Sequence, residues 1–299
     1  MLTIHIAAAP LPESPWGGLL AAYFTVVGIP SGLTLAALWH RGRFPGTSRT
    51  LEWRATWISL VVLGLAGLLL TIDLGRPERF FLMLSRFGNW DSPISLGAKV
   101  IAIKMFLLVL ALYLLWRRRV LSSGTAVPLP ARGSALVFDR GTAWLLGAAS
   151  VALAVYPIAV LAHTWMSPLA GTSGAALIYL ITSLTMGAAV VQFLQVWDHE
   201  ATERQLSTHR QATLALLMTY AVVLVFAAIS VPNGPAEQAL DSLLTGERAP
   251  LLYGGVIGLG VLAPVVVLLG ARHARAGRIV SAVAILIGAG SLRYLVFAA

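Results

Sequence analysis

The amino-acid sequence predicts an all-α integral membrane protein with eight transmembrane helices. Hydrophobic residues make up 58% of the 299 positions and charged residues only 11%, which is too apolar for an ordinary water-soluble domain. Eight apolar runs are each long enough to cross about 30 Å of hydrocarbon, a thickness that takes roughly 20 helical residues. We expect helices because lipid offers no hydrogen-bond partner to an open backbone.

Proline, glycine or charged residues bound each apolar run, and these boundaries define the expected spans. The spans are Gly17 to Trp39, Ala55 to Ile72, Ser95 to Trp116, Ala143 to His163, Gly174 to Trp197, Ala212 to Val231, Leu251 to Gly270 and Ile279 to Phe297. We expect one membrane domain over residues 1–299, built from two four-helix bundles, residues 1–165 and residues 166–299.

Basic residues are distributed unevenly between the two sides of these spans. Of the 21 Lys and Arg residues, 14 lie in the connections after the first, third, fifth and seventh spans, whereas 4 lie in the connections on the opposite side. The positive-inside rule therefore predicts that both termini are non-cytoplasmic. The net charge of +9 follows from this topology, and no basic face with interleaved aromatics suggests nucleic-acid binding. The connection over residues 117–142 contains Ser, Gly and Pro and is expected to be a flexible link.

The segment Asp73-Leu74-Gly75-Arg76-Pro77 closes the second span on the predicted outer side. A carboxylate at the membrane rim is costly unless it has a partner or a task. At about 1.5 Å of rise per residue, several other groups that bind or move protons share this depth. The whole set is Tyr23, Asp73, Lys99, Tyr156 and His163. If the first four spans form a bundle, these side chains can line one pocket.

Each of these residues also has a structural explanation. Tyr23 and Tyr156 are at a depth where tyrosine is common in any membrane protein. Lys99 can extend its long side chain to the surface, and His163 can interact with the C-terminus of its helix. Asp73 can form a salt bridge with Arg76, three residues later.

Two further basic residues lie deeper in the spans. Lys104 is near mid-membrane, where an ammonium group needs the bundle interior, water or an acid as its environment. Arg293 lies in the outer half of the last span and can pair with backbone carbonyls or with Asp73. We assign both residues to a candidate proton path.

We expect this chain to bind no haem, iron–sulfur cluster or metal. Cysteine is absent, so thiolate ligation of a cluster is excluded. A membrane haem b requires two histidines that face each other at matched depth. Four histidines instead gather at the cytoplasmic edge, namely His40, His199, His209 and His273.

Several motifs together resemble the NrfD/PsrC family, the membrane subunit of polysulfide reductase and its relatives. They are Trp16 with Tyr23, Gly28 and Gly32; Asp73-Leu74-Gly75-Arg76-Pro77; Ser92-Pro93-Ile94-Ser95-Leu96-Gly97; and Leu292-Arg293-Tyr294. The likeness covers nearly the whole chain in order. Family members often carry Asn or His near the outer end of the first span, where this chain has Trp16, Gly17 and Gly18.

The resemblance implies an eight-helix anchor in the bacterial inner membrane that binds menaquinone or ubiquinone near its outer face. It implies a ferredoxin-like iron–sulfur subunit docked outside, with a molybdopterin catalytic subunit or a multihaem cytochrome beyond it. We assign the quinone contacts to Tyr23, Asp73, Arg76, Lys99, Tyr156 and His163. Of these, we expect Asp73, Tyr156 and His163 to take part in the proton chemistry.

The sequence leaves two other functions open. A secondary transporter also places charged residues in the membrane and often has broken helices, for which Pro30, Pro157 and Pro264 are candidates. A transporter usually has a polar cluster at the midplane, however, and Lys104 is nearly alone there. The second alternative is a structural anchor that holds peripheral subunits without contacting quinone.

Overall fold

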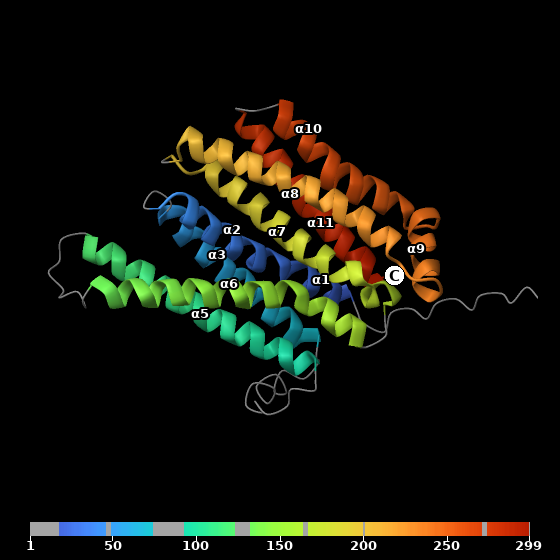
Figure 1. Ribbon diagram of the computed structural model, residues 1–299, viewed down its shortest axis with the longest axis horizontal. Helices are drawn as coiled ribbons and strands as arrows, with labels where there is room; N and C mark the ends of the chain where they lie inside the picture. Colours follow the sequence, from blue (N-terminus) through green and yellow to red (C-terminus); the bar gives the residue numbers. More distant parts are fainter. Residues whose placement is uncertain are drawn as a thin grey trace, which may run out of the picture.

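The predicted all-helical membrane architecture is confirmed. The computed structural model describes residues 18–45, 49–73, 93–122, 132–163, 167–199, 201–270 and 274–298. Within these ranges, eight helices are long and apolar enough to cross a membrane. Figure 1 shows them aligned along a common direction, with α7 running between the helices of the first half of the chain and those of the second half. The outward termini and the two-bundle grouping stay predictions.

The first half of the chain supplies four of the spans. Its helices are α1 (Gly18–Val26), α2 (Gly28–Arg43), α3 (Arg49–Asp73), α5 (Pro93–Ser122) and α6 (Arg132–His163). Helix α2 contacts α3 and α6, and α5 contacts α3 and α6 in turn. Helix α1 also contacts α3, and it reaches across to α11 in the second half.

A short 3₁₀ helix joins the halves, and the second half supplies the other four spans. Its elements are η1 (Pro168–Gly171), α7 (Ser173–Val196), α8 (Glu203–Ile229), α9 (Pro235–Thr245), η2 (Leu251–Leu262), α10 (Ala263–Gly270) and α11 (Arg275–Ala298). Helix α7 contacts α8 and α11, and α11 packs along η2 and α10. The short helix α9 lies near the C-terminus at one end of the molecule (Figure 1).

The two halves meet where α2 crosses α7. Gly32 of α2 and Gly187 of α7 face each other, and a Cβ added at position 32 would lie 1.6 Å from the carbonyl oxygen of Ser183. Glycine therefore lets the two backbones touch. Small residues four positions apart, Gly28 with Gly32 and Ser183 with Gly187, produce the close packing that membrane helices use instead of hydrophobic burial.

Two spans depart from a continuous α-helix. The first is interrupted at Val27, between α1 and α2, and Pro30 lacks the N–H that would bond the carbonyl of Val26. The seventh span is wound as a π-helix over Leu251–Leu262 before it continues as α10. Gly260 in this segment packs against the backbone of Gly288 in α11, so the glycine-rich π-helix lies in close contact with α11.

The prediction that the whole of residues 117–142 forms a flexible link is wrong. Helix α5 continues to Ser122 and α6 begins at Arg132, so both helices run beyond their apolar segments. The extension has a physical reason, because Asp139 near the start of α6 pairs with Arg118 near the end of α5.

Candidate functional site

Three of the predicted quinone residues are buried in the first half of the chain. Tyr23 in α1, Lys99 in α5 and Tyr156 in α6 are 1%, 0% and 5% exposed. None of them is a lipid-facing or surface side chain. Lys99 therefore does not extend to the surface, which removes one of the structural explanations suggested by the sequence.

A glycine brings α5 and α6 together at this cluster. A Cβ added to Gly97 would lie 2.0 Å from the hydroxyl oxygen of Tyr156, so the phenol occupies the space that a side chain would fill. Tyr23 of α1 belongs to the same hydrophobic core cluster as Tyr156. The Tyr23 hydroxyl is buried and has no hydrogen-bond partner among the described residues. An unpaired buried donor is costly, and this one fits a ligand that offers an oxygen acceptor.

The other residues predicted at the membrane rim are Asp73, Arg76 and His163. Asp73 is the last residue of α3, as expected, but its side chain lies outside the described residues, and so does Arg76. His163 is the last residue of α6 and is exposed. The structure thus buries Tyr23 and Tyr156, packs Tyr156 against Gly97 and leaves His163 at the surface of the chain.

Lys104 is completely buried, as its depth in the membrane required. Its Nζ donates a hydrogen bond of 3.0 Å to the carbonyl oxygen of Pro30. The same oxygen accepts from the hydroxyl of Thr34 at 2.7 Å, and Thr34 lies 3.4 Å from the hydroxyl of Ser59. The ammonium group is therefore joined to a short polar chain between α5, α2 and α3.

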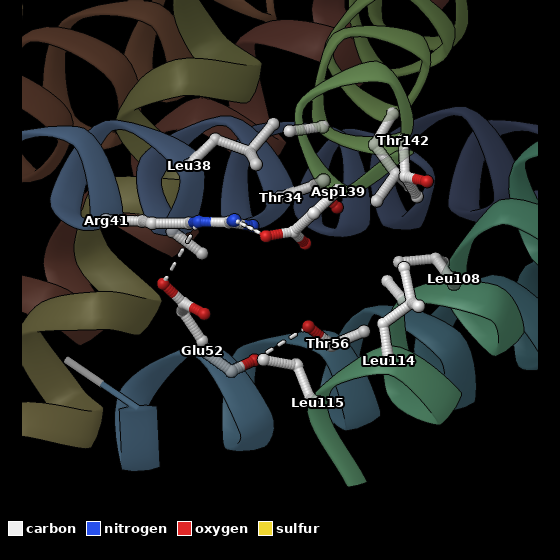
Figure 2. A pocket seen from close by; sticks show the side chains of 14 residues that line it. Thr34, Leu38, Arg41, Glu52, Thr56, Leu108, Leu114, Leu115, Asp139 and Thr142 are labelled. Carbon is white, nitrogen blue, oxygen red and sulfur yellow. Dashed lines mark hydrogen bonds and ion pairs between the residues drawn. The ribbon is translucent and has the colours of Figure 1, made fainter. Parts of the chain in front are cut away.

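That chain leads to a cavity at the predicted cytoplasmic end of α2, α3, α5 and α6. The cavity holds about 40 Å³, which is room for ordered water, and Thr34 is part of its wall. Figure 2 shows Arg41 extended between two carboxylates. Arg41 lies 3.8 Å from Glu52 and 2.5 Å from Asp139, and Asp139 also contacts Arg118.

Glu52 and Asp139 were not among the residues predicted from the sequence. Both are isolated acids among arginines at the predicted cytoplasmic edge, and that pattern was the available signal. It was not sufficient, because the partners of Asp139 come from α2 and α5 and the pairing depends on how these helices are rotated. The two acids share one arginine across the cavity.

Arg293 is 1% exposed in α11 and pairs with neutral groups. On α7, its Nη2 donates to the carbonyl of Tyr179 at 2.7 Å and to the hydroxyl of Ser183 at 2.5 Å. Its Nε donates to the hydroxyl of Thr182 at 3.0 Å. The guanidinium carbon also lies 4.7 Å from the centre of the Tyr179 ring, a cation–π contact. The sequence suggested backbone carbonyls or Asp73 as partners of Arg293, and the described structure shows backbone carbonyls.

Two of the histidines at the predicted cytoplasmic edge form a direct contact between the halves. His40 Nε2 of α2 lies 3.1 Å from His209 Nδ1 of α8, and His209 Nε2 donates to the carbonyl of Ala188 at 2.9 Å. Because His209 Nε2 carries the proton, Nδ1 accepts from His40. Among the described residues, no group of three or more His, Cys, Asp or Glu side chains is arranged to hold a metal ion.

A family model described as polysulphide reductase, NrfD, matches residues 9–299. The protein is 24% identical over 296 residues to a polysulfide reductase chain from Wolinella succinogenes, an alignment that covers 94% of this protein and 92% of that one. It is 25% identical over 244 residues to a putative dimethyl sulfoxide reductase membrane subunit from Halobacterium salinarum, covering 74% of this protein and 53% of that one.

Proposed function

Because the chain belongs to the polysulphide reductase NrfD family, we propose that it is the membrane subunit through which a reductase complex exchanges reducing equivalents with quinone. We place it in the bacterial cytoplasmic membrane. The quinone is menaquinone or ubiquinone. The partner is a ferredoxin-like iron–sulfur subunit on the outer face, linked to a molybdopterin catalytic subunit or a multihaem cytochrome.

The observation that carries this proposal is the unpaired hydroxyl of Tyr23. It is buried in α1, a helix that packs against α3 and α11, and it has no hydrogen-bond acceptor in the described part of the chain. A quinone carbonyl is such an acceptor. The apolar tail of the quinone would lie among the hydrophobic residues that surround these helices.

Quinone chemistry also moves two protons, which need donors and acceptors near the ring. We assign this work to Tyr156, Asp73 and His163, with Lys99 and Arg76 as cationic neighbours of the quinone oxygens. Cysteine is absent from the chain, so we infer that electrons pass to a cofactor of the partner subunit.

A second element of the proposal is a proton route from the cytoplasmic side. The cavity beside Arg41, Glu52 and Asp139 has room for water, and Thr34 joins it to the carbonyl of Pro30 that Lys104 contacts. Lys104 therefore stands between the water-accessible end and the candidate quinone site. We also assign Arg293 to this route, and its guanidinium is buried in α11.

The test is Tyr23→Phe in the intact complex, compared with Tyr113→Phe, which removes the hydroxyl of an exposed tyrosine in α5. Loss of one neutral hydrogen bond predicts that the dissociation constant of a short-tailed quinone rises up to about tenfold. The thermal stability of the quinone-free protein should stay equal or increase, because Phe removes an unpaired buried hydroxyl.

Opposite signs for binding and stability distinguish a ligand contact from a packing role. Unchanged quinone affinity and turnover in Tyr23→Phe would refute the proposed contact. A structural anchor predicts a complex that assembles but binds no quinone, and a transporter predicts a chain that purifies without redox partners.

A further inference from the structure

We propose that Arg293 is a positioning residue of the quinone site, which fixes the backbone at the break between α1 and α2 and so directs the Tyr23 phenol toward the quinone. This inference rests on the proposed quinone function and adds a residue that acts without touching quinone. The guanidinium of Arg293 on α11 is fully buried, and all its hydrogen bonds in the described structure go to neutral groups.

The arginine joins three helices. Three of its hydrogen bonds go to one stretch of α7, and its Nη1 donates to the carbonyl of Phe24 in α1 at 2.8 Å. Phe24 lies in the last turn of α1, three residues before the interruption at Val27. Arg293 thus holds the end of α1 against both α7 and α11.

Gly28, the first residue of α2, provides the space for this contact. A Cβ at position 28 would lie 2.4 Å from Nη1 and 2.5 Å from Cζ of Arg293. The guanidinium therefore lies directly over the start of α2 while it bonds to the end of α1. Both sides of the break are fixed by one planar group.

The fixed segment carries Tyr23. The carbonyl of Tyr23 accepts a hydrogen bond from the N–H of Val27 at 3.0 Å. The next residue in the chain is Phe24, and the centre of its ring lies 6.0 Å from the centre of the Phe297 ring in α11. Phe24 is held on the α11 side by its ring and its carbonyl, and the Tyr23 ring lies 5.3 Å from the Phe24 ring, so the position of the Tyr23 phenol depends on this contact. Movement of the break would move the phenol.

Arg293 is poorly suited to bind quinone itself. A guanidinium has five N–H donors, and four of them are used by Phe24, Tyr179, Thr182 and Ser183. The geometry requires arginine, because lysine offers a single ammonium that cannot span α1 and α7 in the same way.

The experiment measures binding of a short-tailed quinone to the intact complex carrying Arg293→Lys or Gly28→Ala. Arg275→Lys is the control, since Arg275 is exposed on the same helix. We expect the dissociation constant to rise about tenfold in both test variants and to be unchanged in the control. Thr182→Val, which keeps the arginine and removes one acceptor, should give a smaller rise and serves where the other variants do not assemble.

A double-mutant cycle separates positioning from general stability. If Arg293 acts through Tyr23, then Tyr23→Phe combined with Arg293→Lys, or with Thr182→Val, should bind quinone no worse than the weaker of the two single variants. Independent, additive losses would overturn the inference, as would wild-type affinity in Gly28→Ala and Thr182→Val while Tyr23→Phe is impaired. Wild-type affinity in Tyr23→Phe itself would instead refute the proposed function.

Discussion

Replacing Gly32 by alanine should separate the two halves of the protein. An added Cβ would lie 1.6 Å from the carbonyl oxygen of Ser183, whereas ordinary contact begins at 3.4 Å, so α2 and α7 would have to move apart by about 1.8 Å. The obstacle is backbone, which cannot rotate away as a side chain can. The same stretch of α7 carries the acceptors of Arg293, so the displacement would also disturb α11.

The expected cost can be compared with a matched substitution. Overpacking of a close interface costs about 1–3 kcal/mol, and a backbone clash belongs at the upper end. Alanine recovers up to about 1 kcal/mol of helix propensity, so Gly32→Ala should lose about 2 kcal/mol. Gly64→Ala in α3, where nothing lies within 4 Å of the added Cβ, should be neutral or slightly stabilising.

The assay is thermal or denaturant-induced unfolding of the two purified variants in the same detergent. Gly32→Ala should unfold at a clearly lower temperature than the wild type, and Gly64→Ala at the same or a higher one. Equal stability of the two variants would show that the helices are not in backbone contact and would refute the reasoning.

Two more predictions concern the polar interior. Lys104→Met removes a buried ammonium, so the protein should remain stable while quinone-linked proton uptake in proteoliposomes slows at least about tenfold; wild-type uptake would exclude Lys104 from the route. Asp139→Asn should lower stability by at most about 1 kcal/mol, since its partners Arg41 and Arg118 are 28% and 44% exposed. This loss of stability should be smaller in high salt. Asp241→Asn on exposed α9 provides the control. A larger, salt-independent loss of stability would contradict the role of Asp139 as a partly exposed ion-pair partner.

Some of the candidate site could be predicted because depth is readable from sequence. Counting residues from the ends of the spans placed Tyr23 and Tyr156 at similar depth, and both side chains are buried in the structure. The same count placed Lys104 in the interior, where it is buried. Rotation about each helix axis was not readable, so Glu52 and Asp139 were not recognised as the two acids that flank Arg41.

The eight helical membrane spans follow from the sequence alone, because the length and polarity of each apolar run are local properties. The sequence did not determine which face of each helix turns inward. In a membrane, lipid-facing and buried positions are both apolar, so the usual contrast between a polar and an apolar face is missing.

The interactions that join distant segments are fixed only when the helices pack together. The contact of Gly32 with Gly187, the bonds from Arg293 to Phe24 and Tyr179, and the cavity beside Arg41 each depend on helix rotation and crossing distance. Those quantities are set by close packing and by the need of buried polar groups for partners. Neither constraint is visible in a single helix considered alone.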